Sequence, residues 1–276
     1  MTLTETQATV RSLDGTVLAF YRVGTGPAII LVDPALSTHT GSAKLSKALA
    51  GDFSVVSYDR RGRGGSGDEH PESADPAREI EDIAALIDVV GGRAVLFGTS
   101  SGAALALAAA ARLGDRVTGL VAYEPPFICD DSRPPLAEDL PARVAASVAA
   151  GDRTGAVRTF FVEAIGMPRF AVAVMRVLPL WAHAEVIAHT LRYDFAVLEG
   201  TQRGRPLPVE RWSGLTAPTI VLVGSKSEAF FHSTGKRLAD ALPTAQYESL
   251  EGAHHGSPEM SPAAIARLII ERFADA

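Results

Sequence analysis

The sequence predicts an α/β fold in which a mostly parallel, eight-stranded sheet has helices on both faces. Two observations predict it. Short apolar runs of strand length alternate with helical patterns along most of the chain, after an antiparallel start. Between about residues 127 and 211 the alternation stops and only helical periodicity remains. We therefore expect a core made of residues 1–126 and 212–276, and a helical lid (cap) made of residues 127–211.

The expected elements follow in chain order. The first two strands, residues 7–12 and 17–23, flank an Asp-Gly pair that favours a hairpin. Residues 28–32 (AIILV) and 54–58 (SVVSY) are continuous apolar runs, typical of strands buried on both faces. Residues 78–90 carry apolar side chains at three- and four-residue spacing, which indicates one face of a helix. Further strands are expected at 94–97, 117–123, 219–223 and 247–250, and further helices at 101–113, 234–242 and 262–273.

Composition excludes several classes of protein. The 276 residues carry 26 basic and 32 acidic side chains, and a net charge of −6 disfavours a nucleic-acid partner. A single cysteine, Cys129, cannot form an internal disulfide or a cysteine-based zinc site. No stretch of about 18 residues is apolar and uncharged, and the first residues lack the basic and apolar regions of a signal peptide. We expect a cytoplasmic protein without a membrane partner, and the sequence carries no signal for its oligomeric state.

The segment Gly98-Thr99-Ser100-Ser101-Gly102 fits the pattern G-x-S-x-G. It follows an apolar strand and opens the expected helix at 101–113, which is the context of a nucleophile elbow. In such an elbow, a sharp turn holds the serine in a strained conformation, and side chains two residues to either side would collide. The start of the helix also offers N–H groups where negative charge develops. Ser100 is the expected nucleophile, and the N–H of Ser101 is an expected oxyanion-hole donor.

With this elbow, two more segments make the chain resemble the α/β-hydrolase superfamily over nearly its whole length. One is YDRRGRGGSG at residues 58–67, and the other is LPTAQYESLEGAHHGSPE at residues 242–259. The elbow itself reads GTSSGAALAL at residues 98–107, which has the form GxSSG. YEPPF at 123–127 makes the resemblance strongest to actinobacterial-type members, some associated with secondary metabolism. The glycines of 62–67 also match G-x-G-x-x-G, but no helix follows directly, so a dinucleotide site is disfavoured. The resemblance implies no cofactor and no metal.

The resemblance also implies the catalytic base. The family places this histidine three residues after a glycine in the loop that follows the last strand. Counting from Gly252 leads to His255, with the neighbouring His254 as the alternative.

The acid departs from the most common family pattern. The usual position, three residues after Gly224, is occupied by Ser227, which cannot carry a negative charge. A second family position, at the end of the strand at 117–123, holds Glu124. A carboxylate there would fix the tautomer of the histidine and stabilise its protonated form. Glu124 is the expected acid, and Glu228 is the alternative.

The resemblance also implies a role for the loop after residues 28–32. The family usually has His-Gly there, whereas this chain has Asp33-Pro34, and the expected second oxyanion donor is the N–H of Ala35. A carboxylate at Asp33 would oppose a developing oxyanion, so this residue is hydrogen-bonded away, protonated, or part of unusual chemistry. Trp181 is expected to face the cleft from the lid, and Asp33, Trp181 and Phe127 are the expected substrate-pocket residues.

Together these features predict a serine hydrolase that cleaves an ester, lactone or thioester of a small apolar or aromatic molecule through an acyl-enzyme. Two alternatives stay open. One is a secondary-metabolite enzyme that performs lyase, cyclase or epoxide-opening chemistry on the same scaffold. The other is a non-catalytic protein that binds a ligand in the same pocket.

Overall fold

The computed structural model describes residues 4–274, and its eight-stranded sheet confirms the expected fold class. The strands lie in the order β1-β2-β4-β3-β5-β6-β7-β8. Their bounds are β1 (Thr6–Arg11), β2 (Val17–Val23), β3 (Ala28–Val32), β4 (Ser54–Tyr58), β5 (Ala94–Thr99), β6 (Val117–Tyr123), β7 (Thr219–Gly224) and β8 (Ala245–Leu250). The first two strands pair antiparallel at one edge, and β3 to β8 run parallel.

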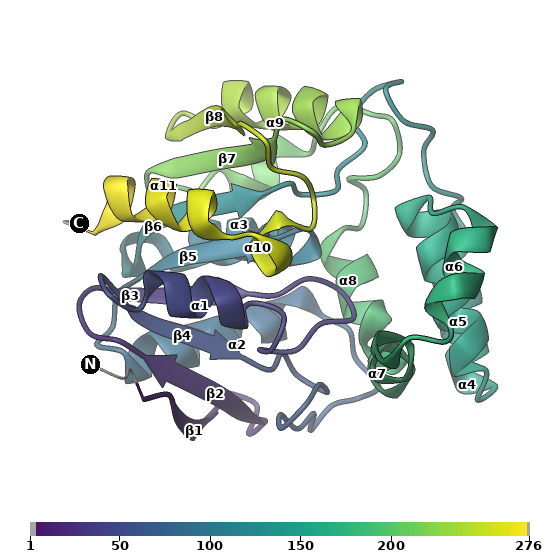
Figure 1. Cartoon of the computed structure of the whole chain (residues 1–276), viewed down its shortest axis with the longest axis horizontal. Coiled ribbons are helices and arrows are strands. Elements are labelled where there is room, and N and C mark those ends of the chain that lie inside the picture. Colours follow the sequence, from purple (N-terminus) through teal and green to yellow (C-terminus); the bar gives the residue numbers. More distant parts are fainter. Residues whose placement is uncertain (1–3, 275–276) are drawn as a thin grey trace.

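Helices cover both faces of the sheet (Figure 1). On one face, α1 (Ala43–Leu49) and α11 (Ala263–Phe273) bury Leu45, Leu49, Ile265 and Ile269 against the strands. On the other face lie α2 (Pro76–Val89), α3 (Ser101–Leu113) and α9 (Ala229–Ala241). The sequence patterns did not indicate α1, because its seven residues give only one apolar repeat. The short α10 (Ser257–Met260) was also not anticipated.

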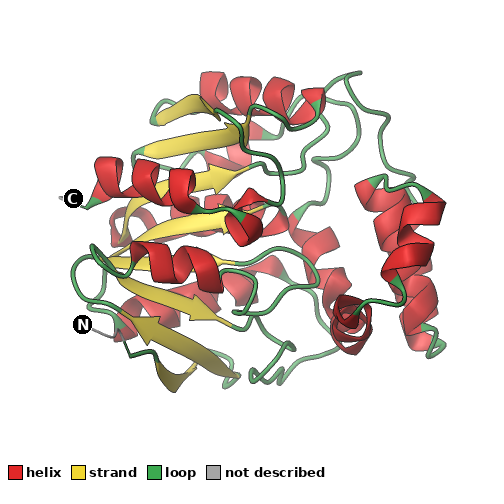
Figure 2. Cartoon of the chain, in the orientation of Figure 1, coloured by secondary structure: helices red, strands yellow, loops and turns green. Residues whose placement is uncertain are grey.

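Between β6 and β7 the described chain contains no strand, and its helices lie beyond the carboxyl ends of the parallel strands (Figures 1 and 2). These helices are α4 (Leu140–Ala149), α5 (Arg153–Thr159), α6 (Arg169–Met175), α7 (Pro179–Ile187) and α8 (Leu191–Val197). We call residues 127–211 the lid segment. Its helices pack through two apolar clusters of their own. In parallel α/β sheets the ligand site lies at the carboxyl ends of the strands, so this segment lies at the end of the sheet where a site is expected.

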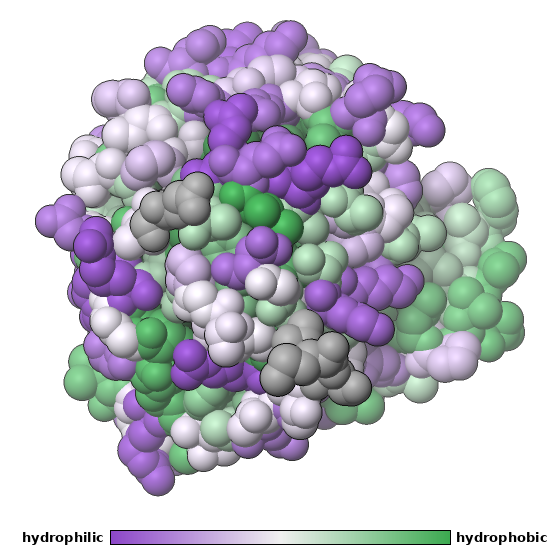
Figure 3. Space-filling model, turned by 60° about the vertical axis from the view of Figure 1, so that its left-hand side comes forward, coloured by the Kyte–Doolittle hydropathy of each residue, from purple (hydrophilic) through white to green (hydrophobic). Residues whose placement is uncertain are grey.

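Part of the outer surface of the lid segment, over α6 and α7, is rich in apolar side chains. Exposed large apolar side chains gather on α6, on α7 and between them: Phe170, Val174, Val177, Leu178, Leu180 and Val186. The more distant part of the molecule at the right of Figure 3 is largely green, that is, hydrophobic. Within residues 4–274, no single helix is long and apolar enough to cross a membrane. The stretch from α6 to α8 reaches that length only as a pair bent by 97°.

Candidate active site

The turn between β5 and α3 has the geometry of a nucleophile elbow. Ser100 has φ 55° and ψ −123°, a conformation that non-glycine residues rarely adopt and that costs backbone energy. A Cβ atom on Gly98 would lie 2.4 Å from the carbonyl oxygen of Gly102, and one on Gly102 would lie 2.2 Å from the carbonyl oxygen of Val32. Both flanking glycines are therefore required by close backbone contacts, and the turn holds the Ser100 side chain at the top of the sheet.

Glu124 and His255 form a hydrogen-bonded pair beside this elbow. Glu124 follows β6 directly, has φ 49° and is fully buried. Its Oε2 lies 2.7 Å from Nδ1 of His255. Its Oε1 accepts hydrogen bonds from the N–H of Gly224 at 2.7 Å and from Oγ of Ser227 at 2.5 Å. Ser227, which stands at the usual position of the acid, thus donates a hydrogen bond to Glu124 at the second position.

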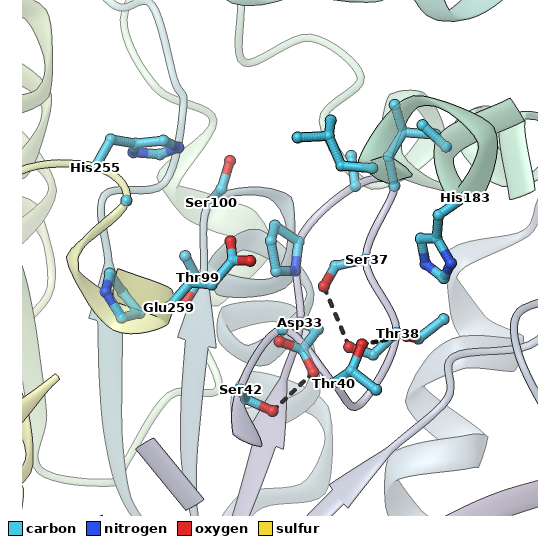
Figure 4. A pocket seen from close by; sticks show the side chains of 18 of the residues that line it. Asp33, Ser37, Thr38, Thr40, Ser42, Thr99, Ser100, His183, His255 and Glu259 are labelled. Atoms are coloured by element: carbon cyan, nitrogen blue, oxygen red, sulfur yellow. Dashed lines mark hydrogen bonds between the residues drawn. The ribbon is translucent and has the colours of Figure 1, made fainter. Parts of the chain in front are cut away.

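The pairing fixes the tautomer of the imidazole. A carboxylate can only accept, so Nδ1 of His255 carries the proton and Nε2 is left to act as a base. The ring of Phe231 stacks on the imidazole, with the ring centroids 4.8 Å apart. Figure 4 shows the His255 ring and the Ser100 hydroxyl projecting into one cavity.

The two alternative residues are placed differently. Nδ1 of His254 accepts the N–H of Gly256 at 3.2 Å, and the backbone carbonyl of His254 accepts the hydroxyl of Tyr123. Glu228 occupies the N-cap position of α9 without a capping hydrogen bond from its side chain, and it lines a smaller cavity that Arg133 also lines. The structure therefore brings Glu124, and not Glu228, to His255.

The two expected oxyanion donors are not equivalent. The N–H of Ser101 lies in the first turn of α3, where backbone N–H groups have no partner within the helix. The N–H of Ala35, by contrast, donates to Oγ of Ser101 at 2.9 Å. In this structure the Ser101 hydroxyl already accepts the N–H of Ala35, and the role of Ala35 as second oxyanion donor stays a prediction.

A buried charge network from the lid segment reaches the same serine. Asp194, on α8, accepts hydrogen bonds from Arg60 at 2.7 Å, from Arg63 at 2.7 Å and from Oγ of Ser101 at 2.8 Å. Arg60 is also paired bidentately with Glu79. Burial opposes ionisation of Asp194, but the two guanidinium groups outweigh it and hold the pKa of this carboxyl below its usual value. The network ties the lid segment to the residue that follows the nucleophile.

Ser100 and His255 line two cavities that also share Ala35, Phe160 and Ile165. The larger, of about 570 Å³, runs between the loop after β3 and the lid helices, and the smaller, of about 150 Å³, lies towards α8 and α9. The lid segment lines the larger cavity mostly with apolar side chains, among them Phe160, Phe161 and Ile165, and with one polar side chain, His183. An acyl-transfer reaction needs space for an acyl group and for a leaving group, and this arrangement provides both.

Comparison with known proteins agrees with this geometry. Residues 30–268 match the profile described as the alpha/beta hydrolase family. The chain belongs to the α/β-hydrolase family. Membership makes the protein a hydrolase. No curated protein matches this hydrolase.

Solved structures resemble this α/β-hydrolase over most of their length. An alpha/beta hydrolase from Sphaerobacter thermophilus is 46% identical, with a TM-score of 0.87; the match covers 96% of this chain and 99% of that protein. A thermophilic esterase from Thermogutta terrifontis is 24% identical, with 96% and 97% coverage and a TM-score of 0.73. The enol-lactonase from Burkholderia xenovorans is 21% identical, with 96% and 98% coverage and a TM-score of 0.72. At these lower identities the likeness shows the fold alone.

Two expected pocket residues of this α/β-hydrolase lie elsewhere. Trp181 lines neither cavity at Ser100; it packs inside the lid segment, and its Nε1 donates to Glu185 at 2.6 Å. Phe127 is fully buried and stacks on Trp212, with ring centroids 5.4 Å apart. Both expectations are wrong, because each aromatic ring packs against other side chains of the fold and does not face a cavity at Ser100. Asp33 does line the larger cavity, as expected.

Sequence reasoning missed other residues at the site. Phe231, which supports the His255 ring, lies on α9 and gives no local signal of this contact. Asp194 could have been noticed, since it stands in the apolar stretch LRYDFAV at 191–197, where a charge requires a partner. Its partners, Arg60 and Arg63, belong to the glycine-rich loop that the sequence had already singled out.

Proposed function

We propose that this hydrolase cleaves an ester, lactone or thioester through an acyl-enzyme on Ser100, with His255 as base and Glu124 as the acid. One observation carries the proposal. Glu124 and His255 are hydrogen-bonded at 2.7 Å beside a strained serine elbow, and Ser100 and His255 both line a cavity large enough for an organic substrate. Neighbouring structures named as an esterase and an enol-lactonase are consistent with this class of reaction.

The chemistry follows from this geometry. Oγ of Ser100 attacks the acyl carbon, and its proton passes to Nε2 of His255. Glu124 stabilises the imidazolium that forms, and the N–H of Ser101 stabilises the oxyanion. His255 then returns the proton to the leaving oxygen or sulfur. In the second half, His255 takes a proton from the water that attacks the acyl carbon. It then gives this proton to Oγ of Ser100 as the acyl–serine bond breaks, which releases the carboxylic acid product and restores the serine.

We further propose that the lid segment is a substrate-covering domain of the chain. Its residues Phe160, Phe161 and Ile165 give the larger cavity an apolar wall. This wall favours a substrate with an apolar or aromatic portion over a sugar.

The experiment is a kinetic comparison on a p-nitrophenyl ester. Ser100→Ala should lower kcat by roughly 10⁴- to 10⁶-fold, because the serine acts as a unit with its base. Glu124→Gln should lower kcat by roughly 10²- to 10⁴-fold, because the wrong tautomer disables the base. Glu228→Gln is the matched control, with the same chemical change at a carboxylate that does not touch His255, and should have a much smaller effect. Near-wild-type activity of Ser100→Ala would instead favour chemistry without an acyl-enzyme.

A further inference from the structure

We propose that Asp33 is a binding site for an ammonium group carried by the substrate, close to the bond that is cleaved. The inference rests on the proposed function and names the substrate class: an ester or related acyl compound with a primary amine a few bonds from its carbonyl carbon and an apolar remainder. Three features of the larger cavity carry it: the position of Asp33, the missing partner of its carboxylate, and the charges of the lining.

Asp33 lies next to the nucleophile because of strand register. Val32, the last residue of β3, is level with Gly98 of β5, so Asp33 comes level with Thr99, the residue before Ser100. Neighbouring strands are about 4.8 Å apart. Figure 4 shows the Asp33 carboxylate in the cavity into which Ser100 projects. A group bound to Asp33 would therefore lie within a few bonds of the attacked carbon.

The Asp33 carboxylate is buried without a cation. The residue is 5% exposed, and the hydroxyl of Ser42 donates to its Oδ2 at 2.9 Å. No hydrogen-bond donor to Oδ1 is found among residues 4–274. The nearby guanidinium groups are directed elsewhere: Arg60 donates to the backbone carbonyl of Asp33, and Arg63 to that of Pro34. Burial raises the pKa of Asp33 to about 7, although Ser42 and the two arginines oppose this rise.

The remaining lining favours a cation and not an anion. No lysine or arginine lines the larger cavity in the described chain. Besides Asp33, its titratable lining residues are His183, His255 and Glu259, and the last of these is exposed to solvent. Hydroxyl groups of Ser37, Thr38 and Thr40 surround the Asp33 end (Figure 4). A substrate carboxylate would meet repulsion here, while an ammonium would find a buried acceptor and neutralise it.

A bound ammonium also resolves the conflict between Asp33 and the reaction. A carboxylate beside the elbow destabilises the negative oxygen of the tetrahedral intermediate when the substrate is neutral. An ammonium held between the two negative groups offsets this repulsion as the oxyanion forms. The site should therefore favour amine-bearing substrates in kcat/KM.

The test compares pairs of p-nitrophenyl esters that differ by an ammonium and a methyl group. One pair is the esters of β-alanine and butyric acid, and a longer pair is the esters of ε-aminocaproic and heptanoic acid. The assay is run at pH 8, above the pKa of Asp33 and below that of an alkyl ammonium, about 10. Wild-type protein should prefer the ammonium member of the shorter pair. Asp33→Asn should lower that preference by roughly 10- to 100-fold, as expected for a charge-assisted hydrogen bond.

Glu259→Gln is the matched control, since it removes the same charge from an exposed side chain lining the same cavity. It should change the ratio little, because an exposed charge is screened. Preference of the wild type for the methyl member of both pairs would overturn the proposal, as would equal effects of the two substitutions. If Asp33→Asn does not fold, butylammonium and butanol are compared as inhibitors of wild-type hydrolysis of the butyrate ester, and the ammonium must inhibit more strongly. If wild-type protein and Ser100→Ala hydrolyse all four esters at the same rate, the result would instead count against the proposed function.

Discussion

Replacing Asp194 by asparagine should destabilise the protein strongly, because it breaks a buried charge network at its centre. Arg60 would keep its bidentate pair with Glu79, but Arg63 would lose the one carboxylate that it contacts in the described chain. It would retain only Thr190 and two backbone carbonyls. Removing one partner of a buried pair costs about 3–5 kcal/mol, since the remaining charge stays buried and uncompensated. For a protein of this size, that loss corresponds to a fall in Tm of roughly 6–20 °C.

The assay is thermal unfolding of three variants beside the wild type. Asp139→Asn is the control, because Asp139 pairs with Arg143 at 3.0 Å on the surface, where both side chains are exposed and a pair contributes at most about 1 kcal/mol. The double variant Asp194→Asn with Arg63→Met should recover part of the loss, since it also removes the stranded charge. The reasoning is refuted if Asp194→Asn is no less stable than the control. A double variant less stable than Asp194→Asn alone would show that the unpaired charge of Arg63 is not the cause of the destabilisation.

Three further predictions concern the site and its turn. Burial raises the pKa of Asp33 from 3.8 to about 7, so between about pH 4 and pH 7 the unfolded chain has released this proton and the folded protein still holds it. The free energy of unfolding should therefore fall as the pH rises through this range. Denaturant unfolding should find Asp33→Asn similar to wild type at pH 4 and more stable than wild type at pH 8. Ser227→Ala removes a hydrogen bond to Glu124 and should lower kcat about fivefold, with unchanged Tm; no change would show that the bond is not used. Gly102→Ala would place a Cβ 2.2 Å from a backbone oxygen and should cost about 3 kcal/mol or more, whereas Gly51→Ala, in open space, should leave Tm within error of wild type.

Local patterns sufficed to predict the elements that hold the site. Strands β2, β3, β4 and β6 have the bounds that the sequence indicated. For β3 and β4 the reason is that both strands are buried on both faces, which favours a nearly continuous apolar run. The elbow could be predicted for a similar reason. Its glycines are required by contacts within five residues of chain and with the adjoining strand, so the pattern itself carries the geometry.

Contacts between distant segments could not be predicted in this way. Trp181 and Phe127 were expected at the pocket on the basis of residue type, yet which surface an aromatic ring faces depends on neighbours such as Glu185 and Trp212. The capture of the Ala35 N–H by Ser101 likewise depends on two segments 66 residues apart. No short-range pattern records such a contact, and only the folded arrangement shows it.

Labelling with a fluorophosphonate tests the central claim most directly, because the probe reacts with a serine only when a base has activated it. We expect one modified peptide, spanning residues 94–113, with the phosphonate on Ser100. Labelling should be abolished in Ser100→Ala and strongly slowed in Glu124→Gln, while Glu228→Gln should label at close to the wild-type rate. Modification of a different residue, or equal labelling rates in Glu124→Gln and the wild type, would contradict the account.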